Sequence, residues 1–266
     1  MIRKIRNILI FIASITIIGC AKDKVEQPIY LLYEFDPMYI AYLMPNYSMF
    51  NNYGSGYEIQ YSNNKISKVI QRSVIGVPMP VNGDISQGQP IDTYDEILYI
   101  GNKVELKRII DKDVPNKVLG TVEFTLDSKK RIIKRTNGRD TIDYYYSGNG
   151  LLQESVTRNG GYCKITSQYY FNSDKNLTCI KGRIENKSGY NLVFNEYFRN
   201  YDSAPNSFSI LGIVSGCFLR SVSRNNFSTY SSSMYTINGE LTDSMEIKHQ
   251  LKYDEKGYAI FVKKKL

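Results

Sequence analysis

The chain has no tryptophan, a single histidine (His249) and only four cysteines among its 266 residues. One histidine excludes a zinc site built from several histidines, and there is no C-x-x-C pair to hold zinc through thiolates. His249 alternates with Ile247 and Leu251, which favours a structural histidine on one face of a strand over a ligand or a base. The G-x-S-x-G turn of serine hydrolases and the glycine-rich loops that hold phosphates are also absent. The sequence therefore predicts no cofactor and no metal ion, and we expect a protein that is not an enzyme.

Catalysis by two carboxylates would leave no motif, because a glycosidase needs only two acids that the fold brings together. Four acidic residues fall within expected strands: Glu123, Asp143, Glu196 and Glu246. Nothing in the sequence selects a pair among them. A hydrolase acting on envelope glycans is therefore the third of three readings of function set out below.

Positive charge is in excess but is not concentrated. The formal net charge is +8, and the densest basic stretch is KKRIIKR at 129–135. Its isoleucines alternate with basic residues at strand spacing, which is typical of a strand with a solvated basic face. The footprint of a nucleic-acid-binding protein is denser than this, so we expect no nucleic-acid partner.

The first twenty residues carry the strongest signal in the chain. Arg3, Lys4 and Arg6 precede a short apolar run at 8–18, and IIGC at 17–20 matches the bacterial lipobox. The apolar run is too short to span a bilayer comfortably, which indicates a signal peptide. We expect residues 1–19 to be cleaved and Cys20 to be lipidated, so that acyl chains anchor the protein in the membrane. The alternative is a chance cysteine after an uncleaved hydrophobic N-terminus.

Three cysteines are left after lipidation, Cys163, Cys179 and Cys217, and an odd number leaves at least one thiol unpaired. A hairpin turn centred on Asp174 and Lys175 would place Cys163 opposite residue 186 and Cys179 opposite residue 170. These two cysteines would therefore not face each other. Buried, reduced cysteines are favoured over one disulfide, and a catalytic thiol is the third alternative.

From residue 57 onward, an aromatic alternating stretch repeatedly runs into a polar turn, and an aliphatic alternating stretch leaves it. The turns returning to the next unit are also coded locally, by Asn-Gly, Gly-Gly or Ser-Gly. This pattern predicts an all-β fold, an extended antiparallel meander of repeated β-hairpins over 57–266. At most one short helix is expected, within 204–222. Residues 20–56 are expected to be a tether followed by an irregular aromatic segment or an initial strand pair, and 76–90 a long loop.

Tyrosine is abundant, with 23 tyrosines and 11 phenylalanines. Two aromatic triplets precede successive turns, and we take them as a candidate contact patch: Tyr144, Tyr145, Tyr146, Tyr169, Tyr170 and Phe171. Tyrosine suits contact surfaces because it joins an apolar body to a polar tip. The alternative is that these residues form cross-strand aromatic ladders that hold the sheet together.

The rhythm Y-x-Y-[SD]-x-x-[GK]-x-[IL] at 57–66, 144–151 and 253–258 resembles the tyrosine-aspartate (YD, or Rhs-type) repeat. Only KYDEKG at 252–257 keeps the Tyr-Asp dipeptide in its usual place. Together with the lipobox, the pattern resembles a Bacteroidetes lipoprotein family of unknown function. In that family a late Y-D-x-x-x-N-P-F segment precedes an apolar stretch, and YDSAPNSF at 201–208 is similar, with the proline displaced. The resemblance implies an extended antiparallel sheet and an exported, anchored protein, and it transfers no catalytic residue.

Two smaller resemblances concern the same phylum. Its O-glycans are attached at Asp-Ser/Thr followed by an aliphatic or similar residue, which fits Thr141, Ser203 and Ser244. Lys22-Asp23 after Cys20 resembles its surface-export signal but lacks the acidic run. We therefore expect an outer-membrane lipoprotein of the cell envelope, with the periplasmic face favoured over the cell surface.

Three readings of function follow from these observations. The first is a non-enzymatic module that binds a glycan or an envelope protein through its sheet. The second is a structural or assembly component of the envelope, and the third is the envelope glycan hydrolase. Exposure of the tyrosines would discriminate among them, since buried tyrosines would support neither a contact surface nor a substrate groove.

Overall fold

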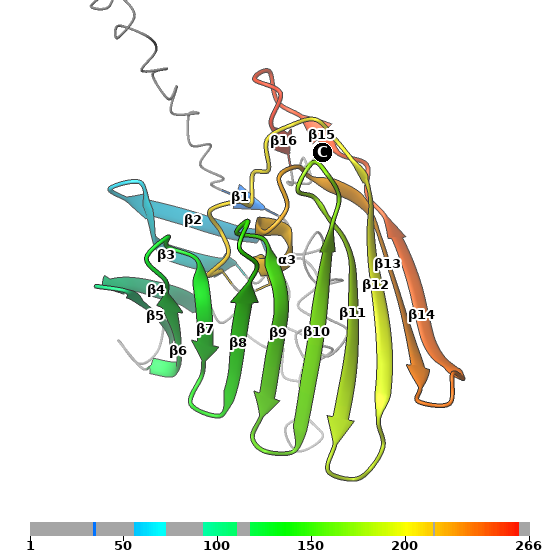
Figure 1. Ribbon diagram of the computed structural model, residues 1–266. Coiled ribbons are helices and arrows are strands. Elements are labelled where there is room, and N and C mark those ends of the chain that lie inside the picture. Colours follow the sequence, from blue (N-terminus) through cyan, green and yellow to red (C-terminus); the bar gives the residue numbers. More distant parts are fainter. Residues whose placement is uncertain (1–33, 36–55, 73–92, 111–117, 215, 261–266) are drawn as a thin grey trace, which may run out of the picture. The chain divides into compact units, whose positions relative to one another are not determined.

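A computed structural model describes residues 34–35, 56–72, 93–110, 118–214 and 216–260 (Figure 1). The described residues lie within one compact unit, Leu32–Leu266. Fourteen strands form one sheet in which each strand pairs with the next in the chain, and a separate two-stranded sheet follows. The strands are β1 (Glu34–Phe35), β2 (Gly56–Ser62), β3 (Lys65–Arg72), β4 (Thr93–Ile100), β5 (Lys103–Ile110), β6 (Val118–Leu126), β7 (Ile132–Thr136), β8 (Asp140–Tyr146), β9 (Leu152–Asn159), β10 (Cys163–Phe171), β11 (Leu177–Asn186), β12 (Leu192–Tyr201), β13 (Phe227–Thr236), β14 (Leu241–Lys248), β15 (Lys252–Tyr253) and β16 (Ala259–Ile260). The prediction of an all-β antiparallel meander is confirmed.

The repeated rhythm in the sequence corresponds to one turn that recurs along the sheet. Its first residue is Asp127, Asn172 or Asp254, whose side-chain oxygen accepts hydrogen bonds from the backbone N–H groups two and four residues later. These bonds measure 2.9 and 2.9 Å at Asp127, 3.1 and 2.9 Å at Asn172, and 2.9 and 2.8 Å at Asp254. Because all these bonds are local, the turn is specified by its own residues.

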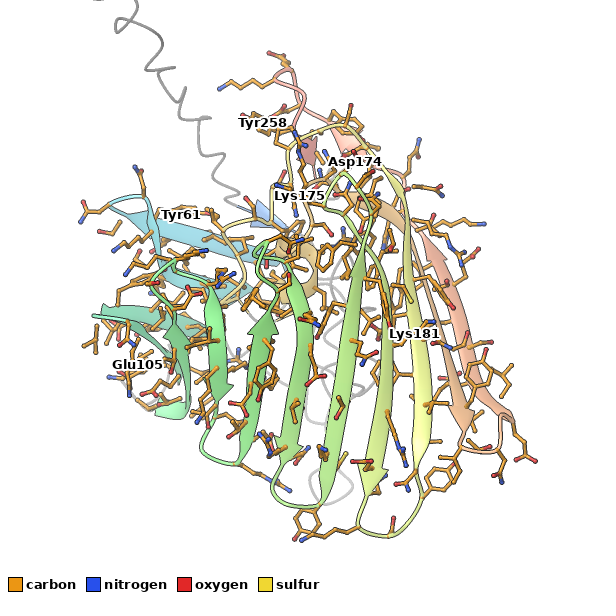
Figure 2. The ribbon with its side chains drawn as sticks, viewed as in Figure 1. Tyr61, Glu105, Asp174, Lys175, Lys181 and Tyr258 are labelled. Carbon is orange, nitrogen blue, oxygen red and sulfur yellow. The ribbon has the colours of Figure 1, made fainter. Side chains whose placement is uncertain are left out.

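The fourth residue of this turn lies in the left-handed region of backbone space. Lys130 has φ +63° and Lys175 has φ +65°. Glycine occupies the same place in the other copies of the turn, at Gly150, Gly189, Gly239 and Gly257. The positive φ explains why the rhythm asks for glycine, and why lysine there is under strain. Figure 2 shows Lys175 beside Asp174 at the turn between β10 and β11.

A long connection replaces the hairpin that the sequence predicts near Asp202. β12 ends at Tyr201, and β13 begins only at Phe227. Asp202 instead accepts a hydrogen bond from the backbone N–H of Asn226 (3.0 Å), 24 residues away. The expected short helix is present within this connection as the single turn α3 (Phe218–Ser221).

The connection covers one face of the sheet. We call this the inner face; it carries Tyr144, Tyr169, Glu196, Phe198 and Tyr230. The rings of Tyr144 and Phe218 of α3 lie 4.6 Å apart between centroids (Figure 1). Leu219 and Val222 pack against the main hydrophobic cluster, whose members are Leu177, Ile180, Phe198, Phe227 and Tyr230.

The chain leaves the large sheet earlier than expected at its C-terminal end. β14 ends at Lys248, so His249 follows the strand and is not part of it. The backbone N–H of His249 still donates to the carbonyl of Ser228 (2.7 Å). Strand structure was predicted for 245–265, but residues 249–260 contribute only the short β15–β16 hairpin, which contains the KYDEKG motif.

The pairing of β10 with β11 confirms the predicted positions of the cysteines. Cys163 lies opposite Asn186, and Cys179 lies opposite Tyr170. Cys163, Cys179 and Cys217 are all free thiols, and the last two are buried. The favoured prediction of reduced cysteines agrees with this arrangement, although Cys163 is only partly buried.

Three expectations fall on residues outside the described part of the chain: cleavage at 1–19, lipidation of Cys20 and the loop at 76–90. Of the 20–56 segment, β1 is described, and it pairs with β2 through Glu34 opposite Glu58. Within the described residues there is no helix with the length and hydropathy needed to cross a membrane.

Candidate functional site

The first aromatic triplet is divided between the two faces of the sheet. Successive side chains of a strand point to opposite faces. Tyr144 therefore lies on the inner face and is 8% exposed, whereas Tyr145 is 48% exposed. Tyr146 also turns away from solvent, because its hydroxyl donates to the carbonyl of Ile132 (2.8 Å) and the Arg131 guanidinium lies 4.4 Å from its ring.

The second triplet follows the same division. Tyr169 lies on the inner face, where its hydroxyl is 2.9 Å from that of Ser155. Phe171 packs against the main hydrophobic cluster. Tyr170 is exposed on the opposite, outer face. Of the six residues predicted as a contact patch, Tyr145 and Tyr170 thus present their rings to solvent on the outer face.

The outer face brings these two tyrosines together with residues from neighbouring strands. Tyr170, Cys179 and Tyr197 are successive partners across β10, β11 and β12. The adjacent row runs from Tyr145 through Glu154, Gln168 and Lys181 to Asn195. We name five of these residues the outer-face cluster: Tyr145, Gln168, Tyr170, Lys181 and Tyr197.

Contacts within the outer-face cluster hold its polar groups beside the rings. The Tyr170 hydroxyl donates to Gln168 Oε1 (3.0 Å). Lys181, midway along β11 (Figure 2), places its Nζ 5.6 Å from the centroid of the Tyr170 ring. The Arg199 guanidinium lies 5.2 Å from the Tyr197 ring. Because Cys179 is small and lies between Tyr170 and Tyr197, the row is low in the middle and flanked by two rings.

Sequence reasoning missed Gln168, Lys181 and Tyr197. The turn at Asp174 and Lys175 was sufficient to place residue 170 opposite residue 179, and the same count reaches Lys181 opposite Gln168. Tyr197 requires the register of the next hairpin as well. A row across several strands was therefore readable only by combining successive turns.

The inner face holds a buried polar group around Glu196. The hydroxyl of Tyr230 donates to Glu196 Oε1 (3.2 Å), and Ser232 is the cross-strand partner of Glu196. Burial raises the pKa of the Glu196 carboxyl to about 7, and the hydrogen bond from Tyr230 opposes this shift. Burial also raises the pKa of the Tyr169 hydroxyl on the same face, so this tyrosine stays protonated.

The four acids that the sequence left as candidates are dispersed over the sheet. Glu123 pairs with Lys103 (3.1 Å), and Asp143 pairs with Arg158 (2.5 Å). Glu246 pairs with Lys248 (2.9 Å) and lies on the outer face, whereas Glu196 lies on the inner face. Their placement on separate strands, with three of them neutralised by cations, offers no pair of facing carboxylates among the four.

His249 and the three thiols show the influence of burial. Burial, together with the charge of Arg220, lowers the pKa of His249 to about 4. Burial raises the pKa of the Cys163, Cys179 and Cys217 thiols. Over the described ranges, no group of three or more His, Cys, Asp or Glu side chains is placed to hold a metal ion.

The three candidate glycosylation residues lie in different settings. Ser203 is exposed at the start of the long connection, and Ser244 is exposed in β14. Thr141 lies in β8 and is partly buried. Their modification stays a prediction.

Comparison with known proteins adds one distant structural likeness. No family model matches the chain, and no curated protein matches it. Among solved structures, the fold is similar to the crystal structure of a porin-like protein from Bacteroides vulgatus. The TM-score is 0.43 and the sequence identity is 12%, over 77% of this chain and 85% of that chain. A likeness at this level carries no argument about function.

Proposed function

We propose that this protein is a lipid-anchored lipoprotein of the bacterial envelope that binds an extended polymer, a glycan or a polypeptide, through the outer-face cluster and without catalysis. The observation that carries the proposal is the register of Tyr170, Cys179 and Tyr197 across three neighbouring strands, with Gln168 and Lys181 in the next row.

The geometry of the row supports an extended ligand. Neighbouring strands lie about 4.8 Å apart, so Tyr170 and Tyr197 are separated by about 10 Å across β11. Each ring offers an apolar surface with a polar tip, and the side chains of Gln168 and Lys181 add hydrogen-bond donors beside them. Tyrosines in such a setting carry a large share of the binding energy at many interfaces.

The anchor is supported by the lipobox at 17–20 and by the basic and apolar segments that precede it. A protein held at the membrane by Cys20 meets envelope polymers at high local concentration, which compensates for a modest affinity. Binding by an open strand surface is therefore a reasonable role for a protein fixed in place.

The test uses the full-length lipidated protein, purified from membranes, on an array of envelope glycans and in pull-down of envelope polypeptides. The double variant Tyr170→Ala/Tyr197→Ala should weaken binding about tenfold or more, since loss of one such contact costs on the order of 1–2 kcal/mol. The matched control is Tyr162→Ala/Tyr190→Ala, which removes two exposed tyrosines from turns at the sheet edge.

The control variant should bind as the unchanged protein does. Equal binding by all three proteins, or a sharp fall in melting temperature for the Tyr170/Tyr197 variant with no change in ligand binding, would contradict the proposal. Retention of a polypeptide and of no glycan would identify the polymer, and the reverse result would do the same.

A further inference from the structure

One edge of the sheet is formed by every second turn of the meander. Because successive strands are antiparallel, the turns β7–β8, β9–β10, β11–β12 and β13–β14 fall at the same edge, the lower one in Figure 1. Neighbouring turns along this edge are separated by two strands, about 10 Å. We call this set of turns the turn row.

The turn row exposes large hydrophobic side chains one after another. Tyr162 at the β9–β10 turn is 67% exposed, and Tyr190 at the β11–β12 turn is 56% exposed. Ile237 at the β13–β14 turn is 59% exposed, and Leu241 follows it at the start of β14. Single exposed hydrophobic residues need no explanation, but a series at successive turns of one edge does.

The opposite edge differs along the same strands. Its turns, β6–β7, β8–β9 and β10–β11, consist of polar residues and glycine: DSKK at 127–130, SGNG at 147–150 and NSDK at 172–175. None of the exposed large hydrophobic residues lies in these turns. The turn chemistry tolerates polar residues at either edge, so folding alone does not require the tyrosines and isoleucine of the turn row.

Hydrogen bonds join the turns to one another. The backbone N–H of Gly160 donates to the carbonyl of Arg139 (3.3 Å), which links the first turn to the second. The backbone N–H of Lys187 donates to the carbonyl of Tyr162 (3.1 Å), which links the second turn to the third. These side chains are therefore presented from a connected support and not from independent loops.

Basic residues accompany the hydrophobic ones. Arg139 and Lys187 are exposed at the first and third turns, and the one acidic residue exposed at the fourth turn is Glu240. Tyrosine rings beside cationic side chains match the boundary between acyl chains and phosphate head groups, where the ring is partly buried and the cation meets phosphate.

We propose that the turn row contacts the lipid surface in which the protein is anchored, with Tyr162, Tyr190 and Ile237 entering the head-group boundary and Arg139 and Lys187 facing the lipid phosphates. This inference rests on the anchor of the proposed function but not on its ligand surface. The chain from Cys20 to Glu34 reaches at most about 50 Å when extended, which is longer than any strand of the sheet and permits this edge to reach the bilayer.

The absence of tryptophan makes the test specific, because one introduced tryptophan is the only such fluorophore in the chain. Tyr162→Trp and Tyr190→Trp place it in the turn row, and Tyr145→Trp places it on the outer face as the matched control. Each full-length lipidated variant is reconstituted in vesicles of phosphatidylethanolamine and phosphatidylglycerol, with and without bromine on the acyl chains. Circular dichroism verifies that each variant keeps the fold.

The two turn-row tryptophans should show blue-shifted emission and quenching by brominated lipid, and the Tyr145→Trp protein should show neither. Emission at 162 and 190 that matches the control and is insensitive to bromine would overturn the inference. Blue-shifted emission without quenching would overturn it too, since a protein partner would then cover the row.

The anchor and the polymer-binding surface are tested separately, by palmitate labelling of Cys20 and by the Tyr170→Ala/Tyr197→Ala variant. Loss of labelling in the wild type removes the anchor, whereas failure of polymer binding leaves the turn row unaffected. The failures of the two proposals are thus distinguishable.

Discussion

The aromatic ring of Phe194 lies directly over Gly182, its cross-strand partner in β11. A Cβ on Gly182 would overlap the ring atoms of Phe194. Glycine in the middle of a strand normally weakens the strand, so its presence here is explained by the close approach of the ring. The pair also closes the inner face next to Glu196, two residues further along β12.

The variant Gly182→Ala should therefore destabilise the protein by about 1–3 kcal/mol, the usual cost of overpacking a well-filled core. The measurement is urea unfolding followed by circular dichroism. Gly120→Ala is the matched control, because Gly120 is also in a strand and nothing lies within 4 Å of its added Cβ. Adding Phe194→Leu to Gly182→Ala should recover part of the loss, and equal stability of the two alanine variants would contradict the packing argument.

The buried carboxyl of Glu196 should make the protein less stable as the pH rises. Its pKa of about 7 in the folded state lies above the ordinary value of 4.5, so the folded state holds the proton more tightly than the unfolded state does. The favourable term is complete below pH 4.5 and is lost as the pH rises toward 7. Glu196→Gln should therefore gain stability relative to the wild type between pH 4 and pH 8, by about 1–3 kcal/mol.

The measurement for Glu196 is the difference in unfolding free energy between variant and wild type at each pH. Taking the difference removes the opposite contribution of His249, whose pKa is lowered by burial and which therefore costs stability as the pH falls from 6.5 toward 4. Glu246→Gln is the control; the hydrogen bond from Lys248 lowers the pKa of Glu246, so this change should give no gain at high pH. A pH-independent effect of Glu196→Gln would refute the assignment.

Replacing Lys175 by glycine should stabilise the protein. Lys175 has φ +65°, a conformation that costs a residue with a Cβ about 1–2 kcal/mol and costs glycine little. Part of this gain is offset by the greater freedom of glycine in the unfolded chain, so we expect a net gain of roughly 0.5–1 kcal/mol. Thermal unfolding should show it, and the reverse change at the same place in another turn, Gly257→Lys, should lower the melting temperature. A loss of stability in Lys175→Gly would mean that the lysine side chain makes a compensating contact.

Lipidation is tested directly at Cys20. The Cys20→Ser variant should accumulate as an unlipidated precursor, because both the cleavage and the acyl transfer depend on that cysteine. Radiolabelled palmitate should enter the wild type and not the variant, and only the wild type should fractionate with the outer membrane. Unchanged labelling of the variant would exclude the lipoprotein assignment, and Cys163→Ser serves as the control for a cysteine within the sheet.

The accuracy of the sequence predictions depended on how local the stabilising contacts are. The turns at Asp127, Asn172 and Asp254 are set by bonds within five residues, and their positions fixed both the strands and the register of Cys179 opposite Tyr170. The connection after Tyr201 was not predictable in this way, because Asp202 finds its partner 24 residues later at Asn226.

The candidate site shows the same limit. Alternation along a strand is sufficient to separate Tyr144 from Tyr145, but it does not say which face is covered, because α3 and its connection decide that. Glu196 could not be chosen among the acids, since its burial depends on Tyr230, 34 residues away. Assigning faces required the long-range packing of Phe218 on Tyr144.

The strict pairing of each strand with its successor has a consequence for how such a chain grows and folds. Contacts are close in sequence, so the contact order is low for a β protein, and hairpins can add one by one as the chain emerges from an export channel. Gain or loss of one whole hairpin shifts the later residues by two strands, which preserves both their face and their edge. Duplication can therefore widen the sheet while Tyr162, Tyr190 and Ile237 keep to one edge, so that the number of repeats and the orientation of the surface evolve independently.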